Sequence, residues 1–376
     1  MKVMIVVTHL LGTGHLSRAL TLARAFDAGG HACTVVSGGM PAAHLDVTGV
    51  TFRQLPPLRS DGVNFRRLLD ESGVDARPQL LKSRAQRLEQ LLREISPDVL
   101  ITELFPFGRR VLSAEFTHLL SCARQLPAPP LICASVRDIL APPSKPAKAQ
   151  AAQALITTYY DAVLVHSDPD ITPLDISWPV SNALAPYLQY TGFVAPPAPQ
   201  AIREKPRGIL VSAGGGDVGA AVFKAALDAA HLDHTRQWHM LVGGGSAQER
   251  IAEMTRQACE NTRIEAARPD FRGLLQRAEA SVSMAGYNTA LDILQTGTPA
   301  VLIPFDAGGE VEQTLRATAL SKLAGISLLP NADLTGAALL SHLDRLRNAP
   351  PRKPQTQAMD GARNSVRITQ AMYHAR

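Results

Sequence analysis

The chain has 376 residues, 45% of them hydrophobic and 19% charged, a balance that supports packed cores and excludes a largely disordered protein. Residues 1–195 carry 18 Lys/Arg against 16 Asp/Glu and residues 196–376 carry 20 against 17, so neither half has the basic excess of a nucleic-acid-binding domain. No run approaches the roughly 18 apolar residues that a membrane span requires, and we expect a cytoplasmic protein.

The first half begins with Lys2–Thr8, a Val- and Ile-rich run typical of a buried strand, which ends in the glycine turn Gly12-Thr13-Gly14 before a helix over Leu16–Ala28. Further strands of this half are predicted at His31–Ser37, Asp98–Thr102, Leu131–Ser135 and Ala162–His166.

Charged residues follow two of these strands directly. Glu103 follows one, and Arg137 and Asp138 follow the next. Because the carboxyl ends of parallel strands meet at one edge of a sheet, these side chains could orient an acceptor or pair with one another. Ordinary ion pairs without a function are the alternative.

The second half repeats the plan of the first. A strand at Arg207–Ser212 ends in Gly214-Gly215-Gly216 before a helix at Val218–Ala230. Later strands are predicted at Trp238–Val242, Thr262–Ala266, Ala280–Ser283 and Pro299–Pro304, and a final helix at Thr356–Ala375.

The alternation of strands and helices predicts an α/β protein with two doubly wound, Rossmann-like domains that face each other across a cleft. The first domain is expected over residues 1–195, a proline-rich linker over 196–205 and the second domain over 206–350. Residues 351–376 form a C-terminal helix, with packing back onto the first domain as one arrangement.

The segment Ser283–Asp292 indicates a nucleotide site. Gly286 follows a strand and allows close approach of a ligand, while Tyr287, Asn288 and Thr289 occupy a first helical turn whose amides and dipole favour a phosphate. Asp292 falls one turn later on the face of Asn288, within reach of a sugar ring's hydroxyls. Such a pocket suits a nucleoside diphosphate.

The glycine triplet Gly214-Gly215-Gly216 is a second candidate phosphate contact, against the alternative of a plain tight turn. His15 follows the first glycine turn at the start of a helix, where imidazole suits proton abstraction near neutral pH. A capping or packing histidine is the alternative, and we favour the general base.

Other nucleotide and metal motifs do not fit. Ser17 stands where a dinucleotide-binding loop has its third glycine, and neither a P-loop nor a G-x-S-x-G elbow is present. Asp168-Pro169-Asp170 is better explained as a turn than as a metal site. The four cysteines have no C-x-x-C pair and no histidine at a ligand spacing, so we expect free thiols and no metal.

These motifs resemble the GT-B fold glycosyltransferases of the family that includes the lipid II-forming N-acetylglucosaminyltransferase, in an uncharacterised bacterial branch. Gly12–His15 is similar to the family's first glycine loop and Gly214–Gly216 to its donor-phosphate loop. Residues 285–292 resemble the family's donor segment, in which Glu stands at the position of Asp292. Glu312-Gln313 is similar to a loop whose Gln contacts the sugar.

The resemblance implies an inverting, metal-independent glycosyltransferase of the hexosyltransferase type, active in polysaccharide or glycoconjugate biosynthesis. The donor is a nucleotide sugar, with UDP by family analogy only, and no cofactor is expected. The loop Arg268–Phe271 would lie near the base and ribose, and Gln313 and Glu312 near the sugar. Gly12, Thr13 and Gly14, with Glu103, Arg137 and Asp138, would line the acceptor side.

Three questions stay open. The acceptor is a glycan, a lipid-linked molecule or a small molecule. The pattern Gly12 to Arg18 also resembles a nucleotide-sugar hydrolase, in which the histidine activates water, and a non-catalytic nucleotide-sugar-binding protein is a third possibility. The seven Lys/Arg of Arg345–Arg376 form either a solvated helical face or a peripheral contact with anionic lipid at the inner face of the membrane.

Overall fold

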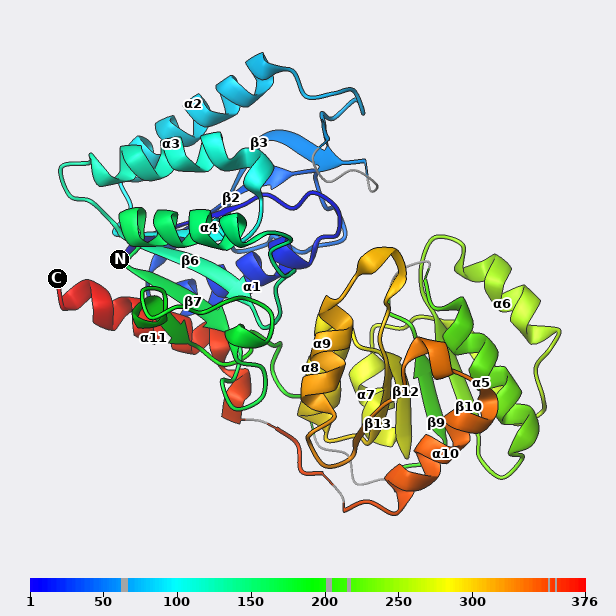
Figure 1. Cartoon of the computed structure of the whole chain (residues 1–376). Coiled ribbons are helices and arrows are strands. Elements are labelled where there is room, and N and C mark those ends of the chain that lie inside the picture. Colours follow the sequence, from blue (N-terminus) through cyan, green and yellow to red (C-terminus); the bar gives the residue numbers. More distant parts are fainter. Residues whose placement is uncertain (62–66, 201–204, 215–217, 351, 356) are drawn as a thin grey trace. The chain divides into compact units, whose positions relative to one another are not determined.

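The computed structural model describes residues 1–61, 67–200, 205–214, 218–350, 352–355 and 357–376. It divides into two compact units (Figure 1): unit 1 holds Met1–Pro196 with Asp360–Arg376, and unit 2 holds Pro197–Met359. The division falls within the proline-rich segment from which the linker was predicted.

Unit 1 is built on an eight-stranded sheet in the order β4-β3-β2-β1-β5-β6-β7-β8, parallel except for the β3–β4 pair. Its strands are β1 Lys2–Val7, β2 Ala32–Gly39, β3 Thr51–Ser60, β4 Leu68–Leu69, β5 Val99–Glu103, β6 Leu131–Arg137, β7 Ala162–His166 and β8 Leu188–Tyr190. Its helices are α1 Gly14–Ala28, α2 Pro78–Ile95, α3 Ser113–Arg124, α4 Pro146–Tyr159 and α11 Gly361–His374.

Both faces of this sheet are buried, as continuous apolar strands predict. Met4 and Val6 of β1 pack into the core under α2, α3 and α4, whereas Val3, Ile5 and Val7 pack into the core under α1 and α11. Helices accordingly lie on both sides of the sheet in Figure 1.

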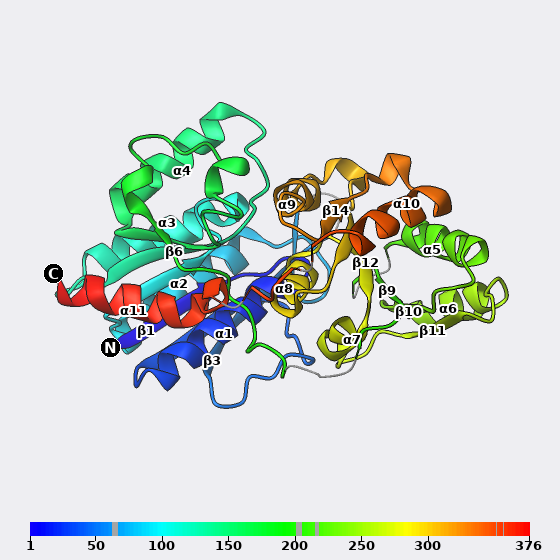
Figure 2. The same cartoon turned by 90° about the horizontal axis from the view of Figure 1, so that it is seen from below.

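Helix α11, near the end of the chain, packs against α1, near its start. Its residue Val366 belongs to the same core cluster as α1, and Tyr373 donates a hydrogen bond of 2.9 Å to the Asp98 carboxylate ahead of β5. Figure 2 shows α11 running beside α1.

Unit 2 is built on a six-stranded parallel sheet in the order β11-β10-β9-β12-β13-β14. Its strands are β9 Ile209–Ser212, β10 Trp238–Val242, β11 Thr262–Ala266, β12 Ala280–Met284, β13 Ala300–Ile303 and β14 Ile326–Leu328. Its helices are α5 Ala220–Leu232, α6 Ala247–Thr255, α7 Phe271–Arg277, α8 Tyr287–Thr296, α9 Glu312–Leu320 and α10 Gly336–Arg347. The prediction of two doubly wound α/β domains is confirmed.

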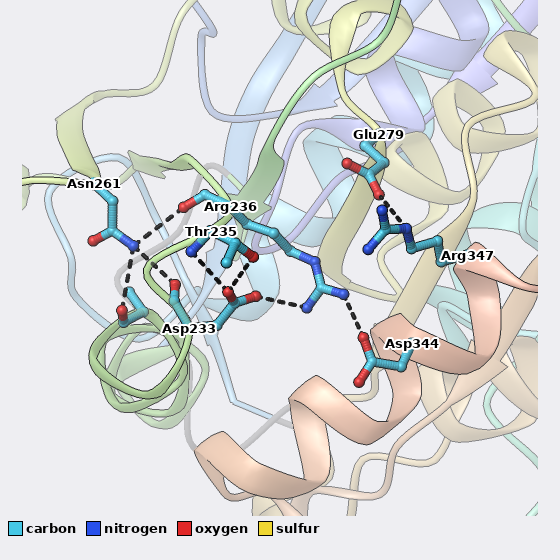
Figure 3. A network of polar contacts seen from close by, with 8 residues as sticks. Asp233, Thr235, Arg236, Asn261, Glu279, Asp344 and Arg347 are labelled. Atoms are coloured by element: carbon cyan, nitrogen blue, oxygen red, sulfur yellow. Dashed lines mark hydrogen bonds and ion pairs between the residues drawn. The ribbon is translucent and has the colours of Figure 1, made fainter.

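Charged side chains brace unit 2 at the amino ends of its strands (Figure 3). Arg236, just before β10, forms an ion pair of 2.8 Å with Asp233 and a second with Asp344 of α10. The Asn261 amide, just before β11, donates to three backbone carbonyls over 2.9–3.3 Å. These contacts therefore tie the loops at the amino edge of the sheet to one another and to α10.

Candidate active site

Each sheet has one switch point, where successive crossovers run in opposite directions and where doubly wound sheets bind ligands outside the carboxyl ends. It lies between β1 and β5 in unit 1 and between β9 and β12 in unit 2. His15 follows β1 and Glu103 ends β5, while Gly214 follows β9 and Gly286 follows β12. Four predicted site residues thus lie at the two switch points.

In unit 1, His15 and Glu103 form a hydrogen-bonded pair. His15 Nδ1 lies 2.9 Å from Glu103 Oε1, and the Glu103 side chain is only 1% exposed. Arg18, one turn further along α1, forms an ion pair with the same carboxylate oxygen. An ionised carboxylate can only accept, and Arg18 Nη2, which lies 3.0 Å from Nδ1, already donates to that carboxylate. We therefore assign the ring proton to Nδ1, which leaves the Nε2 lone pair available.

The charges of this pair follow from burial and from Arg18. Burial lowers the pKa of His15 to about 4, although the hydrogen bond that the ring donates to Glu103 opposes this shift. Burial alone would raise the pKa of Glu103, but the Arg18 charge and the His15 hydrogen bond hold it well below its usual range. A neutral imidazole beside an ionised carboxylate can take a proton at Nε2.

Behind Glu103 runs a chain of buried polar side chains that the sequence analysis did not find. Ser135 Oγ donates to Glu103 Oε2 over 2.5 Å, His166 Nε2 lies 2.9 Å from Ser135 Oγ, and His166 Nδ1 lies 2.9 Å from Thr191 Oγ1. Burial lowers the pKa of His166 to about 3, so the ring is neutral. Glu103 can only accept, and this fixes the direction of the chain: Thr191 donates to His166, His166 donates to Ser135, and Ser135 donates to Glu103. Each of these side chains then has a hydrogen-bond partner.

The first glycine loop leaves room at this site. A Cβ atom added to Gly12 or Gly14 would meet nothing within 4 Å, and neither glycine has a positive φ. Thr13 Oγ1 lies 3.0 Å from His44 Nε2. Neither the packing nor the backbone conformation requires glycine at these two positions. Close approach of a ligand would explain why glycine stands there.

Two of the other residues expected on the acceptor side have buried side chains, and the third, Arg137, is half-buried. Glu103 and Asp138 are each 1% exposed, so the acceptor contact expected of them does not fit their burial. Arg137 Nε donates to the Ile139 carbonyl over 3.1 Å. The structure instead makes Glu103 the partner of His15 and Arg18.

In unit 2, no side-chain cap covers the start of α8. Gly286 is its N-cap, no side chain caps the helix, and Ala290 N donates the first helical hydrogen bond, to Gly286 O, over 2.9 Å. The amides of Tyr287, Asn288 and Thr289 therefore lie in a first turn without helical acceptors. Gly286 has φ −62°, open to any residue, and an added Cβ would meet nothing within 4 Å.

Several predicted donor-binding residues gather around a cavity of about 170 Å³ at the carboxyl edge of the sheet. The cavity is lined by Ser212, Gly214, Leu241, Ala267, Arg268, Phe271 and Thr289. Gly214 has φ +83°, which favours glycine. Gly215 and Gly216 lie outside the described residues.

A wider, more open hollow of about 690 Å³ lies at the amino edge, where Gln237 and Asn261 line it with His231 and Cys259. Ligands of doubly wound sheets bind at the carboxyl edge, so the smaller cavity is the candidate donor site. The Arg268 guanidinium at its rim is held by Asp270, with two bonds of 2.8 Å.

Asp292 of α8 faces Arg272 of α7, a partner that the sequence analysis did not predict. Arg272 Nε lies 3.3 Å from Asp292 Oδ1 without hydrogen-bond geometry, and Arg272 also donates to Gln295 Oε1 over 2.8 Å. Burial raises the pKa of Asp292 to about 6, and the charge of Arg272 opposes that rise. The carboxylate keeps its capacity to accept hydrogen bonds from a ligand.

Glu312 and Gln313 begin α9, which is tied to the start of α8. Gln313 Oε1 accepts a hydrogen bond of 3.2 Å from the Phe305 amide, so its NH₂ group is the part suited to bind a ligand. The buried Arg316 donates to Ala285 O over 3.0 Å and lies 5.8 Å from the Tyr287 ring centroid. The two predicted donor-binding segments are thus held together.

Comparison with known proteins finds a family match for the second half of the chain. The model of the glycosyltransferase family 28 C-terminal domain matches residues 210–371. This part of the chain is therefore similar to a glycosyltransferase family 28 C-terminal domain. The family 28 domain includes Gly286, Asp292 and Gln313, and the family resemblance predicted from the sequence is confirmed.

Curated relatives agree with the family 28 domain. The chain is 29% identical to the UDP-N-acetylglucosamine--N-acetylmuramyl-(pentapeptide) pyrophosphoryl-undecaprenol N-acetylglucosamine transferase of Latilactobacillus sakei over 160 residues, 41% of this chain and 43% of the relative. It is 27% identical to the same enzyme of Paramagnetospirillum magneticum over 184 residues, 46% of this chain and 49% of the relative. Each alignment spans less than half of the relative's length.

Solved structures with similar folds cover the whole chain. Acinetobacter baumannii MurG superposes with a TM-score of 0.62 at 16% identity, covering 99% of this chain and all of that one. CalG4, the calicheamicin glycosyltransferase, gives 0.60 at 16% identity and covers 99% and 94%. The predicted GT-B fold of two Rossmann-like domains is confirmed.

In the described part of the chain, none of the helices is long and apolar enough to cross a membrane.

Proposed function

We propose that this chain is an inverting, metal-independent glycosyltransferase that moves a sugar from a UDP-sugar to an acceptor hydroxyl. The observation that carries the proposal is the start of α8 within the family 28 domain, where Gly286 leaves open space beside first-turn amides that no side chain caps. Backbone donors at a helix N-terminus are a ready site for a diphosphate.

Unit 2 binds the donor in this proposal. The diphosphate lies on the amides of Gly286–Thr289, and the cavity beside Gly214, Arg268 and Phe271 takes the nucleoside. Asp292 accepts hydrogen bonds from the ribose hydroxyls, and the Gln313 amide, with Glu312, contacts the sugar. The helix dipole stabilises the negative charge that develops on the leaving diphosphate. In other transferases a bound metal ion stabilises this charge.

Unit 1 supplies the base. His15 Nε2 takes the proton of the acceptor hydroxyl while the oxygen attacks the anomeric carbon, and the bond from that carbon to the diphosphate oxygen breaks. Attack on the face opposite the leaving group inverts the anomeric centre. Glu103, held by Arg18 and Ser135, fixes the ring tautomer and stabilises the imidazolium that forms.

The relatives' names guide the choice of substrates. Those enzymes transfer N-acetylglucosamine from UDP-N-acetylglucosamine to N-acetylmuramyl-(pentapeptide) pyrophosphoryl-undecaprenol. We propose UDP-N-acetylglucosamine and a lipid-linked sugar of this kind as the first pair to test.

The test measures UDP release from a panel of UDP-, dTDP- and GDP-sugars with the lipid-linked acceptor, with a bacterial glycan extract, and with water alone. Acceptor-dependent release and a product heavier by one sugar residue support the transferase, and NMR of the new anomeric proton reports inversion. Equal release in water alone would show a nucleotide-sugar hydrolase instead. EDTA treatment should leave the rate of sugar transfer unchanged. A rate that falls with EDTA and is restored by added Mg²⁺ or Mn²⁺ would contradict metal independence.

A further inference from the structure

Three side chains with different metal-ligand atoms meet where α2 packs on α3 in unit 1. Glu89 Oε2 of α2 lies 2.9 Å from His118 Nε2 of α3, and Cys122 Sγ lies 3.7 Å from that same nitrogen. All three atoms lie within 4.8 Å of one another. One carboxylate, one imidazole and one thiol therefore point at a single position.

We propose that Glu89, His118 and Cys122 bind a Zn²⁺ ion, with water as the fourth ligand. In a tetrahedral zinc site with ordinary bond lengths, nitrogen and oxygen ligands lie about 3.3 Å apart, and nitrogen and sulfur ligands about 3.6 Å apart. The observed 2.9 Å and 3.7 Å are close to these values, so small side-chain movements suffice to admit the ion.

The surroundings suit such an ion. Arg93 holds the other carboxylate oxygen, Glu89 Oε1, with a bond of 2.9 Å, which orients Oε2 towards His118. The His118 side chain is 45% exposed and gives the ion a route from solvent, while Cys122 is buried and fixed in place. As the ion binds, the Cys122 thiol releases its proton to solvent and binds as thiolate.

The sequence analysis found no histidine at a ligand spacing from a cysteine, and that statement was wrong for this pair. His118 and Cys122 are one helical turn apart, and Glu89 precedes His118 by 29 residues on a different helix. Only the packing of α2 on α3 adds the third ligand. The same two helices are joined by the buried Arg84–Glu115 ion pair of 2.8 Å, so the zinc would be a second tie between them.

The experiment titrates the metal-free full chain with Zn²⁺ against a chromophoric chelator, and with Co²⁺ as a spectroscopic probe. We expect one ion per chain, a thiolate-to-cobalt charge-transfer band, and a rise in Tm of roughly 5 °C at a hundredfold excess of zinc over its Kd. His118→Ala and Glu89→Gln, both at accessible positions, should each weaken zinc binding by more than about 10-fold, the lower range for loss of an outer-shell partner.

Cys122→Ser should abolish the charge-transfer band, and the matched control is Cys259→Ser. Cys259 also lies against a histidine, with Sγ 2.9 Å from His231 Nδ1, but it is not part of a three-ligand cluster among the described residues. Unchanged binding in His118→Ala and Glu89→Gln, or loss of the band in Cys259→Ser with its retention in Cys122→Ser, would overturn the proposal. The proposed sugar transfer does not use this ion, so the two proposals fail separately.

Discussion

His15 owes its proposed role to two neighbours in unit 1. The imidazole is kept neutral by burial, and its Nδ1 proton is directed by a carboxylate that Arg18 keeps ionised. Losing either the ring or the ionised partner should therefore remove proton transfer without disturbing unit 2, where the donor is proposed to bind.

We predict that His15→Ala lowers turnover by about 10²–10⁴-fold with little change in UDP affinity. Glu103→Gln should also lower turnover, because a neutral amide does not stabilise the imidazolium that forms when His15 takes the proton. The control is His44→Ala, which removes only the contact to Thr13 and should stay within a few-fold of wild type. Steady-state kinetics and calorimetry with UDP measure both quantities. A parallel loss of UDP binding in His15→Ala would make that residue structural or a donor ligand.

Asp292 should make donor binding depend on pH. Its pKa of about 6 means that the carboxylate is largely protonated at pH 5 and largely ionised at pH 7. Only the ionised form accepts hydrogen bonds from both ribose hydroxyls, so affinity for a UDP-sugar should rise with pH through about 6. The intact donor is the right probe, because its diphosphate is esterified at both ends and does not titrate there.

The variants of Asp292 separate this effect from others. Asp292→Asn should weaken binding by roughly 10- to 150-fold at pH 7, the range for a charge-assisted hydrogen bond, and should remove the rise with pH. Asp292→Glu should be partly tolerated, since the resembling family has Glu there. Gln313→Ala should weaken the UDP-sugar and spare UDP. A pH profile of Asp292→Asn that matches wild type would refute the ribose contact.

At the scale of elements, helix starts position the proposed chemistry. α1 places His15 and Arg18 one turn apart against β5, and α8 places Asp292 one turn after Asn288 and opposite Arg272 of α7. In both cases a glycine that the fold does not need stands at the helix start, Gly14 in α1 and Gly286 in α8.

We predict that Gly286→Ala leaves the fold intact and impairs donor binding. The backbone at φ −62° accepts alanine, and the added methyl group meets no protein atom within 4 Å, so Tm should be unchanged or slightly raised. The methyl group would instead occupy the space of the diphosphate and weaken UDP by at least about 10-fold, the equivalent of one lost hydrogen bond. Gly273→Ala, inside α7 of the same unit, is the control. Full UDP affinity in Gly286→Ala would remove the diphosphate from this helix.

For the molecule as a whole, local pattern predicted more than long-range packing. Continuous Val and Ile runs predicted the central strands, but Thr51–Ser60 was missed because Pro56 and Pro57 argue against a strand. That strand, β3, lies second from the sheet edge, beside a register shift between Ser37 and Gly39 of β2. Pro56 and Pro57 lie between the paired residues Gln54 and Leu58, where the ladder is interrupted.

The same distinction applies to the site. The turn at Gly286 and the spacing to Asp292 lie within one segment, so the sequence could suggest a ligand pocket there. The partners of Glu103 are distant in the chain, with His15 88 residues before it and Ser135 32 residues after it. Only the neighbouring order β1-β5-β6-β7 in the sheet brings His15, Ser135 and His166 into one line. The sequence offered one signal for this chain of polar contacts, namely that several of the predicted strands end in or near a polar residue.

The buried histidines of that line should make unit 1 sensitive to acid. In the folded chain the pKa of His15 is about 4 and that of His166 about 3, both below the roughly 6.5 of an unfolded histidine. Between pH 6.5 and those values the unfolded chain binds protons that the folded chain does not. Stability is therefore fully present above pH 6.5 and is lost as pH falls towards 3.

We predict that His166→Gln flattens this loss, because a glutamine NH₂ can still donate to Ser135 but does not titrate. At pH 4.5 the histidine should account for about 1–3 kcal/mol of the fall in the free energy of unfolding from its value at pH 7. Unit 1 can be followed alone through Trp178, which is buried in its core, in a Trp238→Phe background that silences unit 2. Urea unfolding at both pH values, with and without His166→Gln, gives the comparison. Equal pH dependence in the two proteins would mean that His166 takes up its proton as readily in the folded chain as in the unfolded one, and the neutral buried line behind Glu103 would have to be redrawn.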